Sequence, residues 1–182
     1  MHLADYSLGA SYSRKTFFKG VSIFVYRDLK YNTIKIDEYN IDKDIEACAI
    51  QLDSTLIKLC ILAVYRSPKG DFTIFHKQLD LILQKLYNNK YSILIYGDIN
   101  VNYLIDTNRR SQLDAVLHFY NLMGIDEFPT RYGLISQMAI DNVFIDTSTF
   151  GKYELYPSVN GLSDHDAQLF ILANGEKKGK GL

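Results

Sequence analysis

The chain has 182 residues, of which 47% are hydrophobic, and a formal net charge of −1. This length supports one sizeable core and is short for two ordinary domains. The near-neutral balance excludes a strongly basic protein that binds nucleic acid by charge alone. No apolar run or long N-terminal apolar segment indicates a membrane span or a secretory signal. Cys48 and Cys60 lack metal-ligand spacing and are predicted to be reduced core residues, typical of a reducing compartment.

Three strands are predicted in the first third of the chain. Gly20 is followed by the β-branched and aromatic run 21–26, which predicts a strand. Segments 46–52 and 56–65 flank the short polar turn 53–55, and this pattern predicts a hairpin. The segment 56–65 carries apolar residues on both faces, which indicates burial on both sides of a sheet.

Two helices are predicted further along the chain. Asp71 can cap a helix, and the apolar residues after it recur every three or four positions up to Leu86. A second helix is predicted from about Thr107, with Gly124 as its stop signal.

Three more strands are predicted, at 91–96, 139–145 and 167–173. Strands interleaved with only two helices predict a mixed α/β architecture, in which sheets pack together and helices lie outside. The polar, glycine-rich tail 174–182 is predicted to be disordered.

Polar residues follow the predicted strand 91–96, in the sequence Gly97-Asp98-Ile99-Asn100. Residues two apart in extended chain point the same way, so Asp98 and Asn100 would share a face. A carboxylate there can accept a proton from water, and an amide can donate to a phosphate oxygen. The alternative is an ordinary turn, since glycine, aspartate and asparagine are all turn formers.

Aspartate and histidine occur together again near the last two predicted strands. Asp164 and His165 precede the final strand, a pairing suited to metal or phosphate chemistry or simply to a solvated turn. Asp141 lies inside an apolar strand, where burial is costly without a partner such as His165. The alternative is an edge strand with Asp141 facing water.

Tyr65 and Arg66 end the predicted strand 56–65. Both side chains can donate hydrogen bonds to phosphate oxygens. The alternative is an aromatic residue that ends a strand and is followed by a turn.

In chain order, the segments LAVYRSP, LIYGDINVN, FPTRYG, AIDNVFID and NGLSDHDAQL resemble the endonuclease domain of non-LTR retrotransposons, within the endonuclease/exonuclease/phosphatase superfamily. The GDxN and SDH motifs are typical of the superfamily, and PTR with IDNVF is typical of its retrotransposon branch, especially insect-type elements. The resemblance runs from about Tyr6 to Leu172. It implies a four-layer α/β sandwich over residues 1–173, with two mixed β-sheets face to face and helices outside.

The resemblance also implies an activity, in which Mg²⁺ or Mn²⁺ assists the attack of water on a DNA phosphodiester. DNA is then the expected partner, with a reverse transcriptase domain in a full-length element. The implied roles are the orientation or deprotonation of water by Asp98, phosphate contact by Asn100 and Tyr65, charge stabilisation by His165, fixation of that histidine by Asp141, metal binding by Asp164, and phosphate or DNA contact by Arg66, Thr130 and Arg131.

The sequence departs from the family at its start. Family members begin with a strand bearing an asparagine and then a strand ending in a glutamate, the principal metal ligand. Here the first residues match the stretch after both strands, and Glu46 and Glu127 lie in other segments. The resemblance therefore implies a truncated domain that binds Mg²⁺ weakly and nicks DNA poorly or not at all.

Two alternatives to the endonuclease interpretation are another superfamily branch, such as a sphingomyelinase or inositol-phosphate phosphatase, and an inactive relic or nucleic-acid-binding module of the same fold. The PTR and IDNVF segments argue against the first. The absence of the family's metal-binding glutamate distinguishes the second from an active endonuclease.

Overall fold

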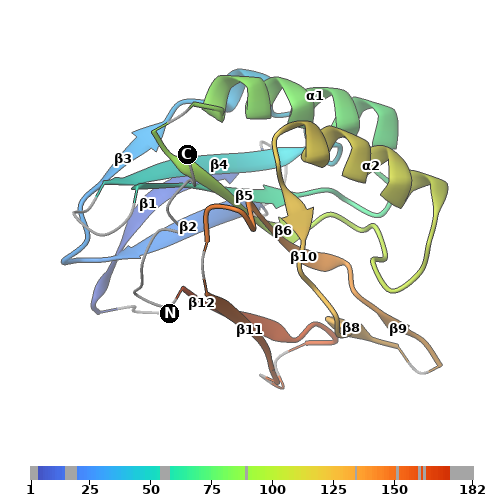
Figure 1. Ribbon diagram of the computed structural model, residues 1–182. Helices are drawn as coiled ribbons and strands as arrows, with labels where there is room; N and C mark the ends of the chain where they lie inside the picture. Colours follow the sequence, from blue (N-terminus) through green and yellow to red (C-terminus); the bar gives the residue numbers. More distant parts are fainter. Residues whose placement is uncertain are drawn as a thin grey trace. The chain divides into compact units, whose positions relative to one another are not determined.

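The structure is a computed structural model that describes residues 4–14, 20–53, 58–88, 90–133, 135–150, 152–159, 161 and 163–172. It consists of two compact units, Met1–Asp98 and Ile99–Leu182. Figure 1 shows the course of the chain through both.

The first unit contains two sheets, one helix and a short 3-10 turn. Its elements are β1 (Tyr6–Ser13), β2 (Gly20–Tyr26), β3 (Tyr31–Ile34), η1 (Asp37–Tyr39), β4 (Glu46–Asp53), β5 (Lys58–Tyr65), α1 (Phe72–Leu86) and β6 (Ser92–Asp98). β1 and β2 form an antiparallel pair, and β3, β4, β5 and β6 are neighbours in that order. The predicted strand 21–26 and the predicted hairpin are confirmed, although the turn at 54–57 lies outside the described residues.

The β3–β6 sheet of this unit is covered on both faces, as the apolar pattern of 56–65 predicts. On one face, Ala10 and Val25 of the β1–β2 pair pack with Cys48 and Ile50 of β4. On the other face lies α1 (Figure 1). Burial raises the pKa of both cysteine thiols to about 12, so they are inert core groups in this structure.

The predicted start of α1 is confirmed in atomic detail. The Asp71 side chain accepts hydrogen bonds from the backbone N–H groups of Thr73 and Ile74, at 2.7 and 3.1 Å. The predicted apolar stripe is buried, from Phe72 to Leu86.

The second unit contains one helix and several short strands. Its elements are α2 (Asn108–Phe119), β7 (Met123–Gly124), β8 (Arg131–Tyr132), β9 (Gln137–Met138), β10 (Asp141–Ile145), β11 (Tyr153–Ser158) and β12 (Ala167–Leu172). β7 pairs with β10, β8 with β9, and β11 with β12, all antiparallel. Within the described residues, neither α1 nor α2 is long and apolar enough to cross a membrane.

The predicted end of the second helix is wrong. The helix begins after Thr107, close to the predicted start, and the Thr107 side chain caps it, but α2 ends at Phe119, and Gly124 lies in β7. Asn121 takes the left-handed conformation usually given to glycine, with φ 59°. The N–H groups of Asn121 and Leu122 then bond back to carbonyls of the last helical turn and close it.

Candidate active site

Three polar side chains line one end of the β3–β6 sheet in the first unit. The register of β4 and β5 places Glu46 opposite Tyr65, and that of β5 and β6 places Ala63 beside Tyr96. Two residues further along each strand, Tyr65 and Asp98 are therefore neighbours. Because side chains alternate between faces, Glu46, Tyr65 and Asp98 project from the same face.

Asp98 lies inside β6, whereas the sequence places it after a strand that ends at Tyr96. The extra length depends on Gly97. A Cβ added to Gly97 would lie 1.7 Å from the Val64 carbonyl oxygen, so only glycine allows β5 this close to β6. The glycine of the GDxN motif thus allows the end of β6, which carries Asp98, to lie against the strand that carries Tyr65.

Arg66 does not belong with these residues. Its side chain has an exposed fraction of 0%, and its guanidinium donates to the carbonyls of Ser67 and Gly70. The guanidinium carbon also lies 5.7 Å from the Phe72 ring centre. A fully buried side chain offers no surface to DNA, so the predicted DNA contact by Arg66 does not fit the structure. Arg66 instead stabilises the loop that leads into α1.

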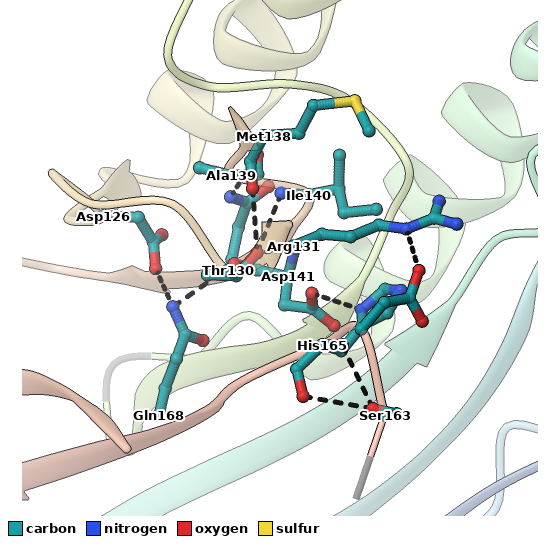
Figure 2. A network of polar contacts seen from close by, with 12 residues as sticks. Asp126, Thr130, Arg131, Met138, Ala139, Ile140, Asp141, Ser163, His165 and Gln168 are labelled. Carbon is teal, nitrogen blue, oxygen red and sulfur yellow. Dashed lines mark hydrogen bonds and ion pairs between the residues drawn. The ribbon is translucent and has the colours of Figure 1, made fainter. Parts of the chain in front are cut away.

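The second unit gathers most of the other predicted residues around the start of β10 (Figure 2). The N–H of Ile99 donates to the carbonyl of Ile140, and the Asn102 side chain accepts from the N–H of Ala139. The segment carrying Asn100 therefore runs beside the residues that precede Asp141. Asn100 has a φ of 52°, a conformation that asparagine tolerates better than most residues and that often marks functional sites.

Asp141 and His165 form the predicted pair. The distance between His165 Nδ1 and Asp141 Oδ2 is 2.8 Å, and both side chains are partly buried (Figure 2). The Ser163 hydroxyl also accepts from the N–H of His165. With Nδ1–H donating to the carboxylate, Nε2 is the ring nitrogen suited to exchange a proton with a substrate. The predicted contact is confirmed.

Thr130 holds the start of β10 in place. Its Oγ1 accepts from the N–H groups of Ile140 and Asp141, at 3.1 and 3.0 Å (Figure 2). Its own backbone bonds to Met138 and Asp166. The exposed fraction of Thr130 is 0%, which does not fit the predicted phosphate or DNA contact.

Arg131 and Asp164 form an ion pair at the surface. Arg131 Nε donates to Asp164 Oδ2 at 2.8 Å, and the side chains are 35% and 52% exposed. The hydrogen bond from Arg131 holds the pKa of the Asp164 carboxyl below its usual range. A carboxylate neutralised by a guanidinium is a poor ligand for Mg²⁺, so the metal role predicted for Asp164 has little support from this contact.

Asp126 is a member of this network that the sequence does not reveal. Its carboxylate accepts from the N–H of Val143 at 2.8 Å and from the amide of Gln168, which also donates to the carbonyl of Asp141 (Figure 2). Asp126 thereby links β10 to β12, the strand that follows His165. Burial raises the pKa of the Asp126 carboxyl to about 6.

This raised pKa predicts a pH dependence of stability. Because the folded chain holds the Asp126 proton more tightly than the unfolded chain, protonation favours folding. The contribution is complete below about pH 4 and is lost as the pH rises through about 6. The free energy of unfolding should therefore rise from pH 7 to 5, relative to an Asp126→Asn variant, by at most about 1.4 kcal/mol per pH unit. Urea unfolding of the unmodified chain and of Asp126→Asn at each pH measures this difference. If the free energy of unfolding varied with pH in the same way in both, the prediction would be contradicted.

Comparison with known proteins gives the class to which this fold belongs. No family model and no curated protein matches the sequence. Solved structures of endonuclease/exonuclease/phosphatase proteins do match, among them one from Bacteroides thetaiotaomicron with a TM-score of 0.58 at 14% identity, over 92% of this chain and 71% of that chain. The predicted fold, an α/β sandwich of the endonuclease/exonuclease/phosphatase type, is confirmed.

Particular structures with this fold are nucleases and phosphatases. The endonuclease domain of TRAS1, a telomere-specific non-LTR retrotransposon, has a TM-score of 0.76 at 16% identity, over 94% of this chain and 81% of that domain. A humanized D. rerio TDP2 has a TM-score of 0.66 at 13% identity, over 90% and 74%. The mannosyl-6-phosphatase Bt3783 of Bacteroides thetaiotaomicron VPI-5482 has a TM-score of 0.61 at 15% identity, over 93% and 78%. At these identities the likeness is one of fold.

Proposed function

We propose that this chain is a divalent-metal-dependent phosphodiesterase that nicks DNA, as the retrotransposon endonuclease resemblance implies. The observation that carries the proposal is the His165–Asp141 pair, with 2.8 Å between Nδ1 and Oδ2. A carboxylate that fixes the tautomer of a half-buried histidine prepares Nε2 to stabilise charge or transfer a proton. The likeness of fold to the TRAS1 endonuclease domain supports the choice of DNA as substrate.

The other residues of the proposed mechanism act on water and phosphate. Asp98 orients the attacking water and accepts its proton, and Asn100 donates to a phosphate oxygen. The Tyr65 hydroxyl donates a hydrogen bond to the same phosphate. Arg131, which is partly exposed, contacts the DNA backbone.

Two of these residues offer ligands of the kind that a hard divalent ion takes. Asp98 offers carboxylate oxygens and Asn100, two positions along the chain, an amide oxygen, which are ligand types of Mg²⁺ and Mn²⁺. Such an ion would supply charge stabilisation at the phosphate when bound. Because Asp164 is paired with Arg131, we expect weak binding of the ion in the absence of DNA.

A plasmid-nicking assay with Mg²⁺ or Mn²⁺ tests the proposal. We expect slow, metal-dependent nicking that falls by about 10²-fold or more in Asp98→Asn, because the general base is lost. Asp28→Asn is the matched control, since Asp28 is an exposed aspartate in the turn after β2.

Two results would overturn the proposal. Nicking that is equal in Asp98→Asn and Asp28→Asn would come from a contaminant or from other residues. DNA binding without nicking under any metal condition would instead identify a nucleic-acid-binding module that keeps the fold without the chemistry.

A further inference from the structure

A buried ion pair lies beside Tyr65 in the first unit. Glu46 has an exposed fraction of 0%, and its Oε1 accepts from Arg14 Nε and from the N–H of Lys43. Among the described residues, Oε2 has no hydrogen-bond partner. Burying an unpaired carboxylate costs free energy, and the ion pair with Arg14 offsets this cost. The same ion pair fixes the orientation of the Glu46 side chain.

Arg14 connects this carboxylate to Tyr65. Its side chain is only 10% exposed, and its guanidinium carbon lies 5.4 Å from the centre of the Tyr65 ring. The planar guanidinium can stack on an aromatic face while its Nε is held elsewhere. Hydrogen bonding to Glu46, followed by a smaller contribution from the Tyr65 hydroxyl, raises the pKa of Arg14 above its usual value. Arg14 therefore stays charged at every pH of interest.

The pair is suited to holding Tyr65 and not to binding phosphate itself. Glu46 and Arg14 together carry no net charge, so they attract an anion weakly. A tyrosine at the end of a strand can rotate about two side-chain torsions, and a guanidinium that lies over its ring and is held by Glu46 restricts both. Glu46 lies directly opposite Tyr65 in the register of β4 and β5, so the pair and the ring share one face.

We propose that Arg14, anchored by Glu46, is a positioning residue that fixes the ring and hydroxyl of Tyr65 for contact with the scissile phosphate. The phosphate part of this proposal rests on the proposed phosphodiesterase function. The positioning part concerns the first unit alone.

A double-mutant cycle tests the catalytic consequence. The variant Arg14→Met/Glu46→Gln removes both charges together, so that neither is left buried and unpaired. We expect it to lower kcat for nicking by about 10-fold with little change in KM, as loss of a supporting residue does. In a Tyr65→Phe background the same double change should have no further effect on kcat. Independent, multiplicative losses would overturn the proposal.

A spectroscopic measurement tests positioning without any activity. The chain is labelled with 3-fluorotyrosine, and the ¹⁹F resonance of Tyr65 is assigned by its loss in Tyr65→Phe. Arg14→Met/Glu46→Gln should shift and sharpen that resonance as the ring becomes mobile, whereas Tyr153 of the second unit serves as the unchanged reference. An unshifted Tyr65 resonance would overturn the proposal even if nicking fell. If the unmodified chain does not nick DNA, the proposed function fails, and the resonance still decides whether Arg14 positions Tyr65.

Discussion

Replacement of His165 by alanine is expected to lower kcat for metal-dependent nicking by about 10²–10⁴-fold, the usual contribution of a positioned acid–base group. The folded state should survive, because the side chain is 28% exposed and lies outside the regular strands, two residues before β12 begins. Asp141→Asn should cost less, about 10–100-fold, because it leaves the imidazole in place and loses only the fixed tautomer. Single-turnover nicking kinetics measure both effects.

His118→Ala is the matched control for this series, because His118 is exposed in the last turn of α2. Thermal unfolding of each variant separates a chemical loss from a structural one. A His165→Ala chain that nicks as fast as the unmodified chain would remove His165 from the proposed mechanism.

Gly97→Ala is expected to destabilise the chain by about 3 kcal/mol or more, at the upper end of overpacking effects. The added Cβ would lie 1.7 Å from the Val64 carbonyl oxygen and 2.7 Å from its carbon, and backbone atoms cannot move aside as a flexible side chain can. β5 and β6 would have to separate where Tyr65 and Asp98 lie. The free energy of unfolding in urea measures the cost.

Gly133→Ala provides a comparison in which the nearest atom belongs to a side chain and not to the backbone. There the nearest atom to the added Cβ is the Ser136 hydroxyl oxygen, at 2.7 Å, which can rotate away. We expect a change within about 0.5 kcal/mol, as for most surface substitutions. Equal losses in the two variants would show that the backbone contact at Gly97 is not the cause.

The sequence predicts the elements whose side chains are mostly buried and misses those that are not. Segment 56–65 and the helix after Asp71 have continuous or periodic apolar patterns, and both are found. β1 exposes most of its residues and includes several serines, so no apolar pattern marks it. β11 contains a proline and is largely exposed, and β8 and β9 are two residues each. Such strands depend on pairing partners that a local pattern does not contain.

The residues proposed for the site show the same limit. Asp98, Tyr65, Asp141 and His165 lie at or near strand ends, where chemistry is expected, and the pairing of Asp141 with His165 follows from the cost of burying a lone carboxylate. A local sequence pattern does not predict which individual polar side chains are buried. Arg66 and Thr130 have the chemistry of phosphate ligands, yet tertiary packing encloses both.

Asp126 and the Arg14–Glu46 pair were missed for a related reason. Arg14 and Glu46 are 32 positions apart in the chain, and Asp126 and Gln168 are 42 apart. No local spacing connects residues that meet only after folding. The one sequence signal is a carboxylate within an otherwise apolar strand, such as Glu46 at the start of β4, because a buried carboxylate predicts a cation from elsewhere in the chain.

The double hydrogen bond accepted by Thr130 has an evolutionary consequence. One hydroxyl serves two buried amide groups, so an isosteric valine would leave both unsatisfied, and serine is the one other residue with an oxygen at that position. Its neighbour Arg131 is partly exposed and paired only with the exposed Asp164 among the contacts described for its side chain. Adjacent codons are therefore expected to drift at different rates, with position 130 confined to two amino acids and position 131 free to change.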